Sequence, residues 1–531
     1  MRGCRGPPCS SCPISGFLKQ AELWRGRAPF TTELGLPSNS KKEASPAGYG
    51  NLYQLLEEPH RLVKTSSLLK RLGKDKNFLY GRLVHHHIIE CGRGWQVLLG
   101  NCLMQMYGKC GLVEESQRIF NMIPNPDSYS WNILINVYGY NKGIGDARYV
   151  FRCMPFPNVV SWNVMITLLS SSGHGKEALS LFCDMQVRGI MLNDVTCIAA
   201  MEACTMLISL KEGKKIHAII IGNGGYNDNI LVGTSLINMY GECGCLQCAK
   251  SVFDAMSYRD VVTWTAMIGC LSQNGCNIQA LEHFQKMESE GVPPNDITFI
   301  CAMEACANLA SLEEGQDIHT KITCTACEDE IKVSNALIDM YGKCGSLSFA
   351  RSIFDKMLER DVISWTSIIG VYGEHGQGKK SLLLFEEMRK LVVPDEVTFL
   401  NVLTACNRSG LADDGKHWFE AMSKSYGIVP NPDHYSCMID LLGKSGCIEE
   451  AQSLMMKMPF PPTYNAWMAF LGACRCKIDV KRAEIAACHL FESYPQNHQP
   501  YILLANLYTA AGMIEDASCL LSIMQSKFTK T

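Results

Sequence analysis

Short polar side chains recur through this 531-residue chain at two fixed places in a repeating pattern. The pattern divides the chain into units of 31 to about 35 residues, and seven units carry Asn or Thr at the fifth residue and Asp or Asn at the last. The fifth residues are Asn101, Asn132, Asn163, Thr234, Thr265, Asn335 and Thr366. The last residues are Asp127, Asn158, Asn193, Asp260, Asn295, Asp361 and Asp395. Such groups hydrogen-bond the edges of planar ligands, so their spacing suits a linear polymer read one monomer per unit.

The two columns differ in how well a purely structural role explains them. Asp or Asn just before a helix is a preferred N-cap, so capping alone accounts for the last residues. Asn and Thr are mediocre helix formers, and we see no reason for solenoid packing to repeat them at the fifth place. The units from 194 and 296 carry Ile198 and Ile300 there. We expect these two units to supply spacing, or contact with the polymer, without distinguishing one monomer from another.

A repeated phrase fixes the period. Met-Tyr-Gly begins at Met106, Met239 and Met340, and the interval from Tyr240 to Tyr341 is 101 residues. Units then start near residues 97, 128, 159, 194, 230, 261, 296, 331, 362, 396 and 432. A degenerate unit precedes them and ends in a Gly-to-His phrase, residues 81–85, that returns at 213–217 and 315–319. A fixed period of this length predicts a repeat array in which each unit contacts its neighbours.

Each unit has the pattern of two amphipathic helices. In the unit from Val261 the first apolar stripe is Trp264, Met267, Ile268 and Leu271, and the second is Ala280, Leu281, Phe284 and Met287. Asn274-Gly275 separates the two, because Gly tolerates the left-handed conformation at a helix end. Neither helix can bury its stripe alone, so the sequence predicts an all-α solenoid of stacked helical hairpins.

Composition alone indicates neither a nucleic-acid partner nor a membrane protein. The net charge of -3 means that the chain is not basic overall, as many nucleic-acid-binding domains are. The chain has no run of 18 apolar residues, so no membrane span is predicted. Many of the 27 cysteines follow the repeat, at 110, 243 and 344 and at 204, 306 and 406. We interpret them as small core residues in a reducing compartment. The first 45 or so residues are rich in Arg and Ser, which favours an organelle transit peptide over a disordered tail without choosing between plastid and mitochondrion.

The phrases at residues 159–163, 236–240 and 311–315 resemble those of pentatricopeptide repeat (PPR) proteins of the plant PLS subclass. The resemblance runs from about residue 61 to 528 and implies a right-handed superhelical solenoid of hairpins similar to tetratricopeptide repeats. It also implies four segments: a transit peptide and linker (1–60), a degenerate L-type repeat (61–96), an array of P, L and S repeats (97–462), and extension (E) motifs without a DYW deaminase domain (463–531).

The resemblance implies that the array binds single-stranded RNA, with its first units toward the 5′ end. The fifth and last residues of a unit would select the base, and the second residue, as in Val160, Val262 and Ile363, would sandwich it. Lys332 departs from that sandwiching type. Carried over unit by unit, the residues select U, pyrimidine, pyrimidine, any base, G, A, any base, U and G. No DNA or membrane partner is expected.

No catalytic constellation stands out in the chain. A zinc deaminase needs His-x-Glu followed by Cys-x-x-Cys, and His-x-Glu is absent. The pairs Cys9/Cys12, Cys245/Cys248 and Cys324/Cys327 have no second pair at zinc-finger spacing, so no metal or cofactor is expected. The run from His85 to His87 is interpreted as surface or packing histidines.

We therefore expect an RNA-binding adaptor for C-to-U editing, not an enzyme. Its DYW-type deaminase partner would be recruited through residues 463–531, unless the sequence is truncated. Two alternatives stay open: stabilisation, splicing or processing of a transcript without editing, and a tetratricopeptide-like protein scaffold.

Overall fold

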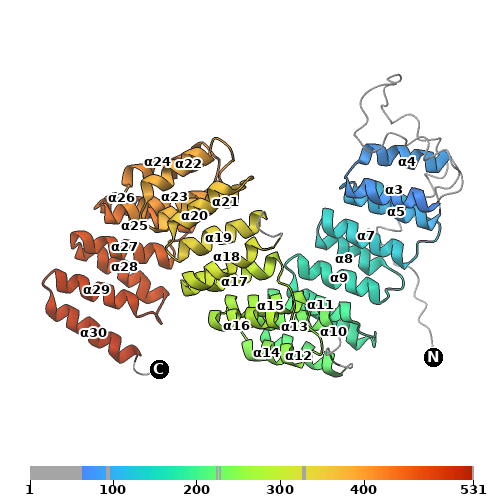
Figure 1. Ribbon diagram of the computed structural model, residues 1–531, viewed down its shortest axis with the longest axis horizontal. Coiled ribbons are helices and arrows are strands. Elements are labelled where there is room, and N and C mark those ends of the chain that lie inside the picture. Colours follow the sequence, from blue (N-terminus) through green and yellow to red (C-terminus); the bar gives the residue numbers. More distant parts are fainter. Residues whose placement is uncertain (1–61, 91–95, 223–224, 226–228, 326–329, 529–531) are drawn as a thin grey trace, which may run out of the picture. The chain divides into compact units, whose positions relative to one another are not determined.

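The computed structural model describes residues 62–90, 96–222, 225, 229–325 and 330–528. Over these residues the chain forms 28 α-helices and no strand. It divides into two compact bodies, one ending at Tyr258 and the other beginning at Arg259. Within each body successive helices pair as hairpins that stack side by side (Figure 1), so the predicted all-α hairpin solenoid is confirmed.

In the first body, the first helices of the hairpins are α3 (Leu62–Lys74), α5 (Val97–Lys109), α7 (Ser128–Asn141), α9 (Val159–Ser171), α11 (Asp194–Met206) and α13 (Ile230–Glu242). Their second helices are α4 (Phe78–Glu90), α6 (Val113–Met122), α8 (Ile144–Cys153), α10 (Gly175–Val187), α12 (Leu210–Gly222) and α14 (Leu246–Ala255).

In the second body, the first helices are α15 (Val261–Gln273), α17 (Asp296–Leu309), α19 (Ile331–Lys343), α21 (Val362–Glu374), α23 (Glu396–Ser409), α25 (Pro432–Lys444), α27 (Tyr464–Lys477) and α29 (Gln499–Ala510). Their second helices are α16 (Asn277–Ser289), α18 (Leu312–Thr323), α20 (Leu347–Lys356), α22 (Gly378–Met388), α24 (Ala412–Lys424), α26 (Ile448–Met456), α28 (Val480–Ser493) and α30 (Ile514–Phe528).

The first helices begin where the repeat predicts. Every expected unit start from 97 to 432 is the first residue of a helix, from α5 through α25. The predicted stripe of α15 is buried, with Trp264, Met267 and Ile268 each 0 % exposed. The α15 helix ends at Gln273, and Gly275 follows with a φ of 77°. The apolar period of the sequence therefore determines both the helices and the faces they bury.

Differences in unit length fall in the second half of the hairpin. The 31-residue units have second helices of 10 residues, in α6, α8, α14 and α20. The longer units have second helices of 11 to 13 residues, as in α10, α18 and α22. First helices from α5 to α25 keep 13 or 14 residues. The fifth residue consequently occupies the same helical turn in every unit.

The repeated phrases form a lock between consecutive hairpins. The hydroxyl of Tyr240 lies 2.7 Å from Nδ1 of His217, and Tyr341 and His319 repeat the contact at 2.8 Å. A Cβ added to Gly213 would collide with the Met239 side chain, so a larger residue there would force that side chain to move. The Gly-to-His phrase of one second helix thus receives the Met-Tyr-Gly phrase of the next first helix.

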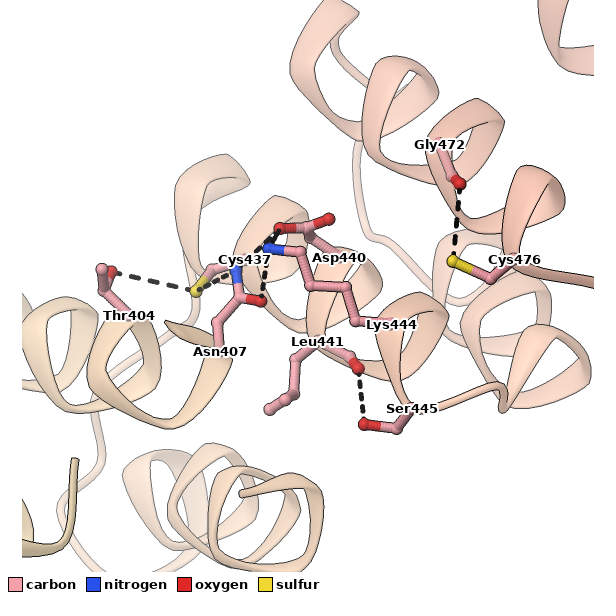
Figure 2. A network of polar contacts seen from close by, with 9 residues as sticks. All are labelled: Thr404, Asn407, Cys437, Asp440, Leu441, Lys444, Ser445, Gly472 and Cys476. Atoms are coloured by element: carbon pink, nitrogen blue, oxygen red, sulfur yellow. Dashed lines mark hydrogen bonds and ion pairs between the residues drawn. The ribbon is translucent and has the colours of Figure 1, made fainter. Parts of the chain in front are cut away.

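Polar contacts also join neighbouring first helices far from their N-termini. Figure 2 shows Asn407 of α23 donating from Nδ2 to Oδ2 of Asp440 on α25 at 2.8 Å. Lys444 reaches the same carboxylate at 2.6 Å and Oδ1 of Asn407 at 3.1 Å. Thr404 lies 3.9 Å from the Cys437 sulfur. These bonds satisfy both polar atoms of the Asn407 amide within the stack.

The phased cysteines divide into two environments. Cys204, Cys306 and Cys406 are 0 % exposed, and burial raises the pKa of each thiol to about 12, as expected of small core residues. The column containing Cys110, Cys243 and Cys344 is only half-buried. The interpretation as core residues therefore holds for Cys204, Cys306 and Cys406. It is wrong for the other column, whose cysteines lie at the C-terminal ends of their helices.

Candidate nucleic-acid interface

The last residue of every unit in the column caps the next first helix. The side chain of Asp127 accepts a hydrogen bond from the backbone N–H of Ser130, and the other six repeat this geometry. The capping explanation of the column is therefore correct. It fixes each of these polar groups at the start of a helix, one per unit.

The fifth residues lie one helical turn inside their own helices and approach these caps. Nδ2 of Asn163 donates to Oδ1 of Asn193 at 2.9 Å, and Nδ2 of Asn335 donates to Oδ1 of Asp361 at 3.3 Å. The structure thus brings members of the two predicted columns together in these two units, although 30 and 26 residues separate them in the chain.

Hydrogen bonds lower the pKa of two closing carboxylates, Asp361 and Asp127. Burial alone would raise the pKa of Asp361, but the bonds it accepts from Ser364 and Asn335 outweigh that effect and leave the pKa below its ordinary value. Asp127 behaves alike, with bonds from Ser130 and Asn101. Both side chains are therefore acceptors at neutral pH, while each paired Asn must turn its amide nitrogen toward them.

Most fifth residues are more enclosed than a row of exposed tips. Asn101 is 3 % exposed, and Asn132, Asn163, Thr234, Asn335 and Thr366 are 6 or 7 % exposed. Thr265 is half-buried. The expectation that packing gives no reason for polar residues at this place is wrong for Asn101, Asn163 and Asn335, because each bonds the cap of the following unit. A ligand would meet these groups only at the edge of the cap network or after a side-chain rotation.

Three of the amides keep an unmet hydrogen-bonding capacity. Oδ1 of Asn101, Asn132 and Asn335 is buried without a partner. Buried amide oxygens are rarely left so in folded proteins. Fold stability alone does not explain these three positions, since an apolar residue would avoid the desolvation cost.

Exposed apolar side chains stand at the second residue of the same helices. Val160, Val262 and Ile363 are 53, 54 and 61 % exposed, as a sandwiching role requires. Six further second residues, which sequence reasoning did not single out, are also exposed: Leu98, Tyr129, Val195, Leu231, Ile297 and Val397. Lys332, the second residue of the unit from 331, is also exposed, but its side chain is charged. Their common register in the repeat was the signal available to find them.

The second and fifth residues share one side of each first helix, because side chains three positions apart are neighbours. Scattered exposed apolar residues are ordinary on protein surfaces. Here they recur in phase, five in the first body and four in the second, each close to a polar group at a cap. The units from 97, 128, 159, 230, 261 and 362 therefore combine an exposed apolar second residue with a polar fifth residue, which are the two elements needed to hold a planar base.

The described residues hold no group of three or more His, Cys, Asp or Glu side chains that could bind a metal ion. Cys9, Cys12 and Cys327 lie outside those residues. The sulfur atoms of Cys245 and Cys248 lie 2.9 Å apart. His85 is 3.0 Å from the Tyr107 hydroxyl and packs edge-on against that ring, which confirms its packing role. Among the described helices, none has the length and apolar character needed to cross a bilayer.

Comparisons with known proteins agree with this architecture. Sequence patterns of the PPR repeat family match residues 157–205 and 259–308. Those of the PPR repeat match residues 101–125, 129–155, 234–261, 333–362, 363–391 and 433–459.

Among relatives, the chloroplastic pentatricopeptide repeat-containing protein CRR2 of Arabidopsis thaliana is 35 % identical over 84 % of this chain, which spans 64 % of its length. A putative mitochondrial pentatricopeptide repeat-containing protein of Arabidopsis thaliana is 37 % identical over 84 % of this chain, which covers 67 % of that protein.

Solved structures show the same fold. The maize pentatricopeptide repeat protein PPR10 aligns with a TM-score of 0.60 and 18 % identity, over 88 % of this chain and 69 % of that one. PPR10 has also been crystallised with an 18-nucleotide psaJ RNA element; that structure aligns with a TM-score of 0.60 and 16 % identity, over 88 % of this chain and 74 % of the other.

Proposed function

Because the chain belongs to the pentatricopeptide repeat family, we propose that it binds single-stranded RNA in an organelle, in a sequence-specific manner and one base per unit. The names of relatives in chloroplasts and mitochondria support the organellar setting. The complex of PPR10 with an RNA element supports the class of ligand.

One observation carries the proposal: each first helix from α5 to α23 except α19 leaves an apolar second residue exposed, and six of these nine helices carry a polar fifth residue. In this arrangement the aliphatic side chain contacts the face of a base and the cap network meets its edge. Stacking contacts give affinity to any sequence, while hydrogen bonds to the edge discriminate between bases.

We assign the bases as the family resemblance implies. Pairs of Asn with Asp, as in the units from 97 and 331, take U. Pairs of Asn with Asn, in the units from 128 and 159, take a pyrimidine. Pairs of Thr with Asp, in the units from 230 and 362, take G, and the pair of Thr265 with Asn295 takes A. The resulting nine-base core is U, pyrimidine, pyrimidine, any, G, A, any, U, G.

We further propose that the chain is a PLS-type site-recognition factor for C-to-U editing. Residues 463–531 would then form extension motifs that recruit a deaminase from a separate DYW-type protein. Two hairpins, α27 with α28 and α29 with α30, occupy most of this segment, and their residue types differ from those of the array. Residues 1–60 are assigned as a transit peptide and linker on their composition. They lie outside the described residues.

The test is a binding titration of the full chain with a synthetic RNA bearing the nine-base core and with a scrambled RNA at matched salt. We expect tighter binding of the core, and equal affinity for both would contradict the base assignment.

The Thr234→Asn variant sharpens the test, because it converts a Thr/Asp pair into an Asn/Asp pair. The preference at the fifth base should move from G toward U, by about 1–3 kcal/mol if the contact resembles base-edge contacts in DNA. Preferences at the other bases should stay unchanged and serve as internal controls.

A further inference from the structure

Three fifth residues contact a hydroxyl that belongs to the following unit. Oγ1 of Thr196 lies 2.6 Å from Oδ1 of Asn163. Oγ1 of Thr298 lies 2.7 Å from Oγ1 of Thr265. The same contact joins Thr398 and Thr366 at 2.8 Å. Each contact links two first helices that follow one another in the chain, and the threonine from the later helix is always the third residue of its unit.

These threonines are held rigidly in the cap network. Thr196, Thr298 and Thr398 are each 0 % exposed. Each takes part in a reciprocal capping box with the closing residue before it, Asn193, Asn295 or Asp395. A buried β-branched side chain that makes several hydrogen bonds has little freedom to move. It can therefore fix the orientation of whatever it contacts.

In three other cases the fifth residue is Asn and the third residue of the following unit is serine. The contact between the fifth residue and that hydroxyl is absent in these units. Oγ of Ser130, Ser161 and Ser364 lies 2.8, 3.0 and 2.8 Å from Oδ1 of the cap before it. The preceding fifth residues, Asn101, Asn132 and Asn335, are those whose Oδ1 has no partner. Among the units from 97, 128, 159, 261, 331 and 362, the fifth residue is thus either held from the next unit or left partly unsatisfied.

The contact decides which hydrogen-bonding role remains for a base. In Asn163 the amide donates to Asn193 and its oxygen lies against Thr196, so the amide cannot flip. Oγ1 of Thr265 lies 2.7 Å from the carbonyl oxygen of Val261 and 2.7 Å from Oγ1 of Thr298, so its single proton is engaged whichever hydroxyl donates. The remaining lone pair of Thr265 can only accept from a ligand.

We propose that the third residue of the following unit is a positioning residue that sets base selectivity in the units from 159, 261 and 362. This inference rests on the proposed RNA-binding function. It gives a role to the units from 194 and 296, whose own fifth residues, Ile198 and Ile300, cannot discriminate. Through Thr196 and Thr298 they help to read the base bound by the unit before them.

The experiment compares full-length wild-type protein with Thr298→Val and Thr298→Ser, titrated with core RNAs that carry each of the four bases at the sixth position. Valine keeps the shape of threonine and removes the hydroxyl, whereas serine keeps the hydroxyl. For Thr298→Val we expect the ratio of Kd values between A and the other bases to fall by about 3- to 10-fold, the worth of one net hydrogen bond. Thr298→Ser should retain most of the ratio, and selectivity at the fifth and ninth positions should not change.

A purely structural role of Thr298 predicts something different. The valine variant would then lose thermal stability and bind every RNA more weakly by one common factor, with the sixth-position ratio intact, and this result would overturn the inference alone. Wild-type protein that shows no base preference at any position would instead overturn the proposed function, and the inference with it. Thr196→Val, read at the third position, repeats the test in the first body.

Discussion

The array and the C-terminal hairpins are built alike but present different residues. In α15 of the array the second residue is the exposed Val262 and the fifth is Thr265, beside the cap of α17. In α27 the corresponding residues are Asn465 and Met468. Both helices have an N-cap whose side chain accepts from the backbone, Asp260 in one and Thr463 in the other. The hairpin fold is therefore retained while the pairing of apolar contact and polar edge is lost.

The C-terminal hairpins replace that pairing with aromatic contacts between their own helices. Trp467 of α27 stacks on His489 of α28, with ring centroids 4.4 Å apart. Phe491 stacks on Tyr501 of α29 at 3.9 Å. Stacking into a solenoid depends on the buried stripes, whereas a base-reading surface depends on the second, fifth and last residues. The two properties can consequently vary independently along one chain.

The largest expected effect compares the tryptophans at the fourth place of α15 and α27. Trp264 is 0 % exposed, so Trp264→Ala should destabilise its hairpin by about 3–5 kcal/mol through lost burial and the remaining cavity. Trp467 is half-buried, and Trp467→Ala should cost less than half as much. Hydrogen exchange of the amides in each hairpin measures both, since a repeat array need not unfold in one step. Equal losses would refute the burial argument.

A smaller effect concerns the His–Tyr lock, which the described C-terminal hairpins replace with the stacked pair of Trp467 and His489. Burial, with a lesser contribution from His86, lowers the pKa of His85 from 6.5 to about 4. Between pH 4 and pH 6.5, His85 binds more protons in the unfolded state than in the folded state. The stability that depends on a neutral His85 is therefore complete above pH 6.5 and is lost as the pH falls toward 4. The free energy of unfolding should fall by up to about 3 kcal/mol over this range.

Hydrogen exchange of α4 and α5 at pH 7.5 and pH 5 measures the change. The variant His85→Phe removes the titrating group, so its α4 should show a much smaller pH response. An unchanged response in that variant would place the pH sensitivity elsewhere.

The smallest effect concerns the exposed second residues. Val262→Ala should weaken RNA binding by about 1 kcal/mol, because two methyl groups no longer cover the base. Its thermal stability should stay within about 0.5 kcal/mol of wild type, since the side chain is 54 % exposed. Leu358→Ala, at a residue 93 % exposed and outside the second-residue row, is the matched control and should leave both quantities unchanged. If Leu358→Ala weakened RNA binding as much as Val262→Ala, the exposed second residues would have no particular role in binding.

Sequence reasoning located the helices because a period of apolar residues with Gly and capping signals leaves few alternatives. Val97, Val159 and Val261 were each identified as unit starts, and each begins a helix. Reasoning about the candidate site was less complete. It found the two polar columns and identified Val160 and Val262, but overlooked Leu98 and Val397, which share their register; only burial shows that this register is exposed in each of these units.

The sequence by itself determined the hairpin solenoid, its register and the residue types at the second, fifth and last places, since these follow from local periodicity and capping. Only the tertiary structure decided that Asn163 meets both Asn193 and Thr196, while Oδ1 of Asn335 meets no partner. The reason is geometric: a hydrogen bond requires placement within a few tenths of an ångström. The stacking of one hairpin on the next sets that placement, and residue spacing along the chain does not specify it.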